Sequence, residues 1–359
     1  MDSLKPTVMR IMTQHGEGMA YVGLLNQLKQ NIESRTQGQL VVELLTSGKG
    51  ASDREIMTNQ MRGTLEGGWI SGLTMAQRIP SFQILNLPLV FNDANQLNRF
   101  INSSLDKAIR KMAVEQNLMI MGYGSYGFYG IMIFDEAETN SSRQKSVDAL
   151  EYMGNRMIRV PGDAWVAKMQ ETLPGKVVRG NHSVDKKAVL NQASGLLTTP
   201  ELIASSEWLG RVTHFLNLRH IHGWTVFSIN RAWFETLPPH QRMVVGQEAE
   251  VICQKALQAG VLRHDNLVQQ WYIRRHPLVL QASWDRMAQL MGTLIEKTST
   301  QLEGLLALKG LVRALWDVNF RLGMSTGSRA PKSEVTEAPQ IQSEDVQVGR
   351  TEILTMKKP

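Results

Sequence analysis

The sequence has a single cysteine, Cys253, among its 359 residues. One thiol cannot form an internal disulfide, and no second cysteine is present to help bind a structural zinc ion. Cys253 stands in an apolar helical pattern, where an isolated cysteine is usually a packing residue. The scarcity of cysteine therefore excludes a disulfide framework, but it is compatible with both the cytoplasm and the periplasm.

Long hydrophobic runs are also missing, because no segment approaches the ~20 apolar residues that a helix needs to cross a bilayer. The first six residues lead directly into a strand-like segment, without the charged and apolar regions of a signal peptide. Two interpretations are open. Either the protein is not exported, or its export signal has been removed and replaced by a start methionine.

The excess of charge of one sign is small. Lys and Arg together number 39 and Asp and Glu 33, which gives a net charge of +6. The positive residues are scattered, whereas a nucleic-acid-binding protein usually gathers them on one face or along one helix. The mild basic balance is compatible with anionic small molecules, and nucleic acid is not expected as a partner.

Motifs of hydrolytic catalysis are absent, because the sequence contains neither G-x-S-x-G nor H-E-x-x-H. A formal G-x-G-x-x-G occurs at Gly122–Gly127 (GYGSYG), directly after a strand-like segment. In a dinucleotide site a helix would follow and its N-terminus would bind the pyrophosphate. Here Phe128–Phe134 (FYGIMIF) is typical of a strand, so we interpret the glycines as a crossover between two lobes.

A metal site is not expected either. His220 and His222 could lie on one face of a strand, with His214 close in sequence, but no Cys or carboxylate is nearby to complete a zinc site. The sequence thus predicts no metal, no cofactor and no local catalytic constellation, although residues distant in the sequence can still converge in a fold.

Short β-type segments alternate with helical ones along the chain, which predicts parallel sheets in an α/β protein. Strands are expected at 7–13, 39–46, 63–71, 117–123, 156–160 and 224–230, and helices at 19–34, 52–61, 94–115, 163–173, 184–191, 238–259 and 284–322. The length is sufficient for two such sheets and hence two lobes. Residues 324–359 are polar without sustained periodicity and are expected to form a disordered tail.

Arg159 is the candidate binding residue that the pattern itself suggests. It stands at the end of the β-type run 156–160, just before Pro161. Ligands approach the carboxyl ends of strands in α/β sheets, and a guanidinium group matches a carboxylate with two parallel hydrogen bonds. From the local sequence alone, a surface arginine at a strand end is the alternative interpretation.

A series of short segments carries a resemblance to a known family. In order they are PTVMRIMTQ (residues 6–14), SRTQGQLVVE (34–43), RGTLE (62–66), IPSF with LPLVFND (79–82 and 87–93), DALEYMGNRMIRVP (148–161) and NRAWFETLP (230–238). The sequence resembles the DctP-type family of TRAP transporter solute-binding proteins from about Pro6 to Ala259, and more loosely to Lys297. Six such segments in family order distinguish this resemblance from a chance match of one motif.

The resemblance implies a two-lobed, periplasmic-binding-protein-like fold with crossover strands, a long helix spanning both lobes and C-terminal helices. Lobe I is expected at 1–125 and about 211–250, and lobe II at about 126–210 and 251–323. The implied function is non-enzymatic capture of a small organic acid in the periplasm, for delivery to TRAP membrane subunits. The amphipathic helices at 284–322 could wrap the back of the protein or pair with another copy; we favour wrapping and therefore expect a monomer. Arg159 is then the residue that clamps the carboxylate.

Two departures from the family pattern concern ligand choice. Tyr129 stands where many members carry a second arginine, and 192–199 (QASGLLTT) lacks the acidic residue of the family's segment. A site with one guanidinium and additional aromatic groups suits a monocarboxylate with an apolar or aromatic body better than a dicarboxylate.

Other candidate ligand-binding residues come from likely strand ends and from a loop. Trp69, Tyr126 and Trp224 join Tyr129 as candidates for the pocket wall, although aromatic residues at such places often pack in a core. Glu17, in the loop after the first strand, could bind a polar group or a cation, or it could be an ordinary acid at a helix N-terminus. Two other function classes stay open: a ligand sensor for a signalling partner, and an enzyme on a bilobal α/β frame.

Overall fold

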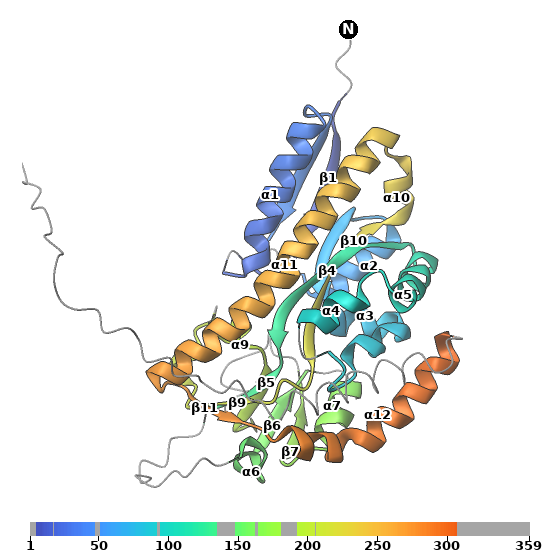
Figure 1. Cartoon of the computed structure of the whole chain (residues 1–359). Coiled ribbons are helices and arrows are strands. Elements are labelled where there is room, and N and C mark those ends of the chain that lie inside the picture. Colours follow the sequence, from blue (N-terminus) through green and yellow to red (C-terminus); the bar gives the residue numbers. More distant parts are fainter. Residues whose placement is uncertain are drawn as a thin grey trace, which may run out of the picture.

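The computed structural model describes residues 5–16, 18–46, 51–91, 94–134, 148–161, 164–180, 192–204 and 206–306. Within these residues the chain forms two β-sheets with helices on their faces (Figure 1). The two-lobed α/β architecture expected from the sequence is therefore confirmed. The expected helix at 184–191 and the expected tail lie outside the described residues.

Sheet A, the sheet of lobe I, has the strand order β2–β1–β3–β10–β4. β1 is parallel to β2 and β3, whereas β10 is antiparallel to β3 and β4. The strands are β1 (Thr7–Met12), β2 (Leu40–Leu45), β3 (Gly67–Ser71), β4 (Leu118–Phe128) and β10 (His222–Asn230). The helices around them are α1 (Ala20–Arg35), α2 (Asp53–Arg62), α3 (Gly72–Arg78), η1 (Pro80–Asn86), α4 (Ala94–Phe100), α5 (Ser104–Glu115) and α10 (Arg231–Thr236).

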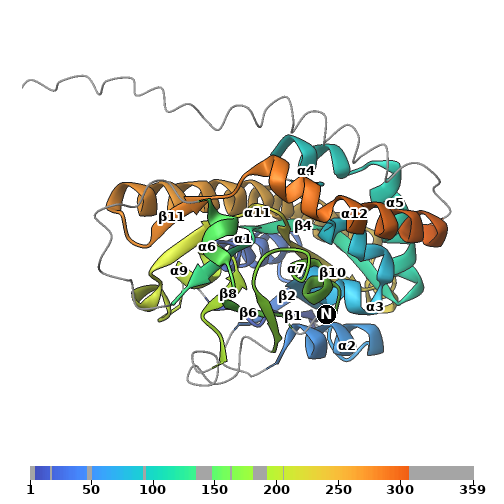
Figure 2. The same ribbon diagram turned by 90° about the horizontal axis from the view of Figure 1, so that it is seen from below.

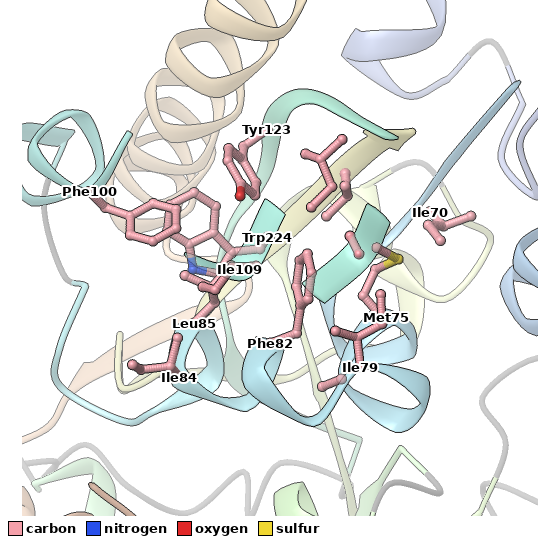
Figure 3. Packing of buried hydrophobic residues seen from close by; sticks show 14 of the residues in the cluster. Ile70, Met75, Ile79, Phe82, Ile84, Leu85, Phe100, Ile109, Tyr123 and Trp224 are labelled. Atoms are coloured by element: carbon pink, nitrogen blue, oxygen red, sulfur yellow. The ribbon is translucent and has the colours of Figure 1, made fainter. Parts of the chain in front are cut away.

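Apolar clusters cover sheet A. One cluster joins α2, α3, η1 and α5 to β4 and β10, and Figure 3 shows Phe82, Phe100, Tyr123 and Trp224 packed together there. A second cluster joins α1 to β1, β2 and the long helix α11 (Pro239–Arg274). Burial of this apolar surface is the main force that holds lobe I together.

Sheet B, the sheet of lobe II, has the order β11–β9–β5–β8–β6–β7. Its strands are β5 (Gly130–Ile133), β6 (Met157–Val160), β7 (Lys176–Arg179), β8 (Gly195–Thr198), β9 (His214–Asn217) and β11 (Leu278–Gln281). Its helices are α6 (Ala149–Met153), α7 (Ala164–Gln170), α9 (Pro200–Ala204) and the short η2 (Leu209–Arg211). Because β9 pairs with β5 and β11, the expected start of the second lobe I segment near residue 211 was wrong, and that segment begins after β9.

Two chain segments and one helix connect the lobes. β4 continues through Tyr129 into β5, and residues 218–221 lead from β9 to β10. These crossovers are joined where the Tyr129 N–H donates to the carbonyl of Ile221 at 2.9 Å. The 36-residue helix α11 runs along both lobes (Figure 1).

The glycines of the G-x-G-x-x-G motif lie in and at the end of the crossover strand β4, as the interpretation of that motif predicted. A Cβ on Gly122 would collide with Cys253 of α11, and a Cβ on Gly260 of α11 would collide with the backbone of Ser125. The glycines thus let the helix approach the strand closely. No phosphate-binding function is needed to explain them.

One local expectation about secondary structure was wrong in its starting point. The expected strand at 63–71 begins only at Gly67, because Gly63 ends α2 with a φ of 76° in the left-handed region that glycine tolerates. The segment from Pro80 to Asn86 is a 3₁₀-helix that begins at a proline.

The C-terminal helix α12 (Trp284–Leu306) follows β11 and runs along η1 of lobe I (Figure 2). Its Met287, Met291 and Ile295 are buried in one cluster with Leu73 of α3. The helix thus contacts residues of both lobes. No helix in the described ranges has the length and apolar character needed to cross a membrane.

Candidate functional site

Direct contacts join the two lobes away from the crossovers. Glu201 Oε1 of α9 accepts a hydrogen bond at 3.0 Å from the backbone N–H of Ala20, the first residue of α1. On another side, Trp165 Nε1 of α7 donates to the carbonyl of Asn86 at 3.4 Å. We call the region between these contacts the interlobe site. β1 and β3 of sheet A are parallel, so their carboxyl ends lie at one edge of that sheet, and the same holds for β6 and β8 of sheet B.

Arg159 lies on β6, between β7 and β8, one residue before the carboxyl end of the strand. Its side chain is buried with the residue only 6% exposed, and Nη1 donates to Gln192 Oε1 at 3.0 Å. A Cβ on Gly180, just beyond β7, would collide with the guanidinium group, so glycine there leaves room for it. A buried guanidinium at a strand end is well suited to bind a carboxylate.

Asp53 is a charged residue of lobe I that the sequence did not single out. It is the first residue of α2, which begins there because Ser52 and Glu55 form a capping box. Its Oδ2 accepts a hydrogen bond from the N–H of Ser71, at the end of β3, at 2.8 Å. Burial raises the pKa of Asp53 to about 7, and the bond from Ser71 opposes this rise.

Aromatic side chains gather next to Asp53. We call Tyr21, Trp69, Tyr126 and His15 the lobe I aromatic cluster. Tyr21 stacks on Trp69 with ring centroids 4.9 Å apart, and the ring of Tyr126 lies 5.4 Å from His15 and 6.0 Å from Tyr21. Burial is the main cause that raises the pKa of the Tyr21 and Tyr126 hydroxyls, and the charge of Asp53 adds to this rise in both.

Trp69 and Tyr126 thus lie close together, and both are core residues of lobe I. Trp69 is fully buried between Tyr21 and Phe227, whose ring lies 5.5 Å from it. Its indole Nε1 has no hydrogen-bond partner within the described ranges. Their contact with a ligand stays a prediction.

Tyr129 lies at the junction of β4 and β5, where the chain passes from lobe I to lobe II. Its ring packs in the cluster that contains Ile158 and Val160, the two neighbours of Arg159 on β6. The charge of Asp53 also acts on its hydroxyl, whose pKa is raised chiefly by burial. Tyr129 therefore connects the Asp53 side of the interlobe site with the Arg159 side.

Trp224 is placed differently from the other aromatic candidates. Its indole lies among Phe91, Phe100 and Tyr123, each with its ring centroid 5.4–5.6 Å away. Figure 3 shows Trp224 beside Phe100 and Tyr123. This is the core between β10 and the helices of lobe I. Packing accounts for Trp224, and the structure does not bring it to Arg159. Glu17, the remaining candidate, lies outside the described residues.

The histidines considered for a metal site are buried near the crossovers. His222 Nε2 lies 2.8 Å from Ser125 Oγ, and His264 Nδ1 of α11 accepts a hydrogen bond from the N–H of Phe128 at 3.1 Å. Burial lowers the pKa of His220 and of His222 to about 3. Among the residues the structure describes, no group of His, Cys, Asp and Glu side chains could hold a metal ion.

Two comparisons of the sequence with known proteins test the family resemblance. Residues 12–176 match the family model DctP, described as bacterial extracellular solute-binding protein, family 7. The family resemblance is confirmed. An uncharacterized protein of Haemophilus influenzae is 23% identical over 109 residues, which make up 30% of this chain and 33% of that relative, so the match spans about a third of its length.

Solved structures share the fold over most of the chain. A TRAP periplasmic solute-binding protein from Ochrobactrum anthropi has a TM-score of 0.75 at 14% identity, covering 90% of this chain and 98% of that one, and it holds a C-terminus in its ligand-binding pocket. One from Pseudomonas putida F1, with bound D-glucuronate, has a TM-score of 0.72 at 15% identity, covering 84% and 95%. The sugar acid binding protein DctPAm from Advenella mimigardefordensis, in complex with galactonate, has a TM-score of 0.73 at 15% identity, covering 89% and 99%. At sequence identities of 14–15%, the similarity to these structures shows that this chain shares their fold.

Within this DctP-type fold, sequence reasoning missed Asp53 and Glu201. Asp53 reads in sequence as an ordinary acid in the first turn of a helix, and only the fold shows that it is buried. Glu201 follows closely after the segment 192–199, which lacks an acid, and it is 1% exposed with Arg263 Nε at 3.3 Å. A search for acids just beyond that segment would have found it.

Proposed function

We propose that this chain is the extracytoplasmic solute-binding subunit of a TRAP transporter, which captures a small organic acid between its lobes in the periplasm and delivers it to membrane subunits. The single observation that carries the proposal is the buried Arg159 at the carboxyl end of β6, inside the region that matches the DctP family. A guanidinium group in this position can bind a carboxylate with two parallel hydrogen bonds.

The ligands of similar structures support an acid as the ligand class. The Pseudomonas putida and Advenella mimigardefordensis proteins contain D-glucuronate and galactonate, and both compounds carry a carboxylate. Tyr129, where many family members have a second arginine, is buried and uncharged here, because burial raises its pKa. We therefore expect a monocarboxylate with an apolar or aromatic body, such as a keto or aromatic monoacid, to bind more tightly than succinate.

Binding requires no covalent chemistry. The lobes hinge at the crossovers and close on the ligand, which removes water from the interlobe site. Loss of water lowers the local dielectric constant and strengthens the attraction between Arg159 and the carboxylate. The closed protein then docks on the membrane subunits. Ligand recovered unchanged after unfolding is the expected result, whereas turnover would assign an enzyme.

Thermal-shift measurements with a panel of organic acids test the proposal. A ligand that binds the native state raises the melting temperature by mass action, by an amount that corresponds to about 2.7 kcal/mol at a hundred times its Kd. We expect one class of acid to raise the melting temperature of the wild type, and Arg159→Ala to abolish that shift.

The matched control is Arg179→Ala. Arg179 lies beside Val160 on the neighbouring strand β7, but its side chain is exposed and bonds Glu171. This variant should keep the full ligand-induced shift. A shift that persists in Arg159→Ala would contradict the proposed clamp, and the absence of a shift with any acid would contradict the proposed ligand class.

A further inference from the structure

The C-terminal end of α11 carries the most exposed large apolar side chains in the described part of the chain. Tyr272 and Ile273 are each 70% exposed. Three basic residues, Arg274, Arg275 and His276, follow them directly and are exposed as well. We call Tyr272–His276 the α11 tip, and it lies at an outer end of the ribbon in both Figure 1 and Figure 2. Adjacent apolar side chains with this exposure differ from the singly scattered ones of an ordinary surface, and they indicate a contact.

The sequence on either side of the α11 tip supplies no free negative charge. No Asp or Glu occurs between Asp265 and Asp285, and Asp265 accepts a hydrogen bond from Arg219 Nη1 at 2.6 Å. The strand β11, which follows the tip, has the sequence LVLQ and carries no charge. The flanking segments therefore do not neutralise the two arginines of the tip, which attract a negatively charged surface.

Arg275 occupies a backbone position that glycine usually takes. It is the C-cap of α11, with a φ of 53° and a ψ of 30° in the left-handed region. A side chain costs free energy in this conformation, because Cβ comes too close to the backbone. Arg274 in the last turn already provides a cation for the helix dipole. The end of the helix therefore does not explain the second arginine, whereas a surface role for its charge does.

The combination of these side chains favours a lipid surface over a protein as the partner. Tyrosine is enriched where membrane meets water, and arginine can lay its apolar stem along a hydrocarbon boundary while its head stays in the polar layer. Each Lys or Arg near an anionic membrane surface strengthens binding by a factor of about five. A protruding helix end can enter a fluid surface that adapts to it, whereas a protein partner needs a groove of matching shape.

We propose that the α11 tip binds the protein reversibly to an anionic lipid bilayer. Tyr272 and Ile273 enter the boundary between headgroups and acyl chains, and Arg274 and Arg275 contact lipid phosphates. The contact is peripheral, since no helix in the described ranges could span a membrane. The proposal goes beyond the proposed function, because no step of acid capture requires it. It would keep the protein near the surface where delivery takes place.

Co-sedimentation of the full chain with lipid vesicles tests the electrostatic part. One set of vesicles is phosphatidylcholine alone, and the other contains about one third phosphatidylglycerol. We expect at least about tenfold tighter binding to the anionic vesicles. The double variant Arg274→Gln with Arg275→Gln should reduce this preference to within about threefold.

The matched control is the double variant Arg62→Gln with Arg78→Gln. Both residues are exposed, and they are the last residues of α2 and α3, so the variant loses the same charge at two other helix ends. It should keep the preference for anionic vesicles. An equal loss in the two double variants would show general attraction by the net charge and would overturn the proposal. So would a lack of binding to either kind of vesicle, which would favour a protein partner.

A fluorescent label tests which part of the molecule enters the lipid. The native Cys253 is buried, so an environment-sensitive dye reacts at a cysteine placed on the surface. The dye at Ile273→Cys should shift to shorter wavelength with anionic vesicles, whereas the dye at Met243→Cys, 50% exposed near the other end of α11, should not. Equal shifts at both positions, or none at Ile273→Cys, would contradict insertion of the tip.

Arg275→Gly separates the lipid contact from a structural role. Glycine relieves the left-handed C-cap, so this variant should melt about 1–3 °C higher while it binds anionic vesicles about fivefold more weakly. Unchanged vesicle binding in this variant would remove Arg275 from the proposed contact. Vesicle binding is measured without acid, and the thermal shifts with acids are measured without vesicles. Failure of the lipid contact therefore leaves the proposed function standing, and failure of acid binding leaves the lipid contact standing.

Discussion

At the scale of single residues, the two charged groups of the interlobe site differ in how visible they are in the sequence. Arg159 could be predicted because a strand-like run ends at Pro161 and ligands approach strand ends. Asp53 could not, because the pattern Ser52-Asp53-Arg54-Glu55 is that of any capped helix. Its burial comes from β3 and the aromatic residues of other segments, and a single-sequence pattern holds no record of such contacts.

Burial of Asp53 predicts a specific dependence of stability on pH. The folded chain keeps a proton on this carboxyl group up to a pKa of about 7, whereas an unburied Asp loses it near 3.8. Between these values the folded state binds more protons than the unfolded state, so the contribution of Asp53 to the free energy of unfolding falls as pH rises from 4 to 7. Tyr21, Tyr126 and Tyr129 face the group but stay protonated in this range, since their pKa values are raised.

The measurement is the denaturant-unfolding free energy of unliganded wild type and of Asp53→Asn at several pH values. Buried His220 and His222 have lowered pKa values and act with the opposite sign in both proteins, so they cancel in the difference. We expect the wild type to lose stability relative to Asp53→Asn between pH 4 and 7, and the difference to level off above pH 7. A difference that is constant from pH 4 to 8 would show that Asp53 ionises normally.

At the scale of elements, the sequence predicted most strands and helices of both sheets, because their hydrophobic periodicity is strong. The long helix is an instructive exception. A helix was predicted as far as Ala259, and the next residue is Gly260, a weak helix former. The helix α11 instead continues to Arg274, because Gly260 lies where the helix crosses Ser125 of β4. A tertiary contact here overrides local propensity.

This crossing predicts opposite effects for two equivalent substitutions in α11. Gly260→Ala places a Cβ against the carbonyl and side chain of Ser125, so it should lower the free energy of unfolding by about 1–3 kcal/mol, as overpacking usually does. Gly246→Ala, in the same helix, meets no atom within 4 Å and should raise it by about 0.5–1 kcal/mol. Urea unfolding followed by circular dichroism measures both. Equal effects of the two substitutions would show that helix propensity, and not the crossing, decides the role of Gly260.

At the scale of the whole molecule, the two-lobed architecture was predictable, but the contacts that hold the lobes together were not. The bond between Glu201 and the Ala20 N–H joins residues 181 positions apart on elements of different sheets. Its acceptor lies at the N-terminus of α1, where the helix dipole favours a negative charge. The sequence pattern could show that each lobe forms, but not how one lobe meets the other.

The Glu201 contact predicts a link between lobe closure and affinity. Glu201→Gln removes the negative charge that meets the N-terminus of α1 and that lies 3.3 Å from Arg263, so the arrangement with the lobes in contact should lose on the order of 1 kcal/mol. Apparent affinity falls in proportion to the fraction of protein that can adopt the binding-competent state, which predicts about fivefold weaker ligand binding.

Small-angle X-ray scattering should show a larger radius of gyration for the unliganded variant than for the unliganded wild type, and equal values at saturation. Glu171→Gln, an exposed acid of lobe II, is the control that should change neither quantity. Weaker binding without a change in the scattering of the unliganded protein would mean that Glu201 acts on the ligand directly and not through closure.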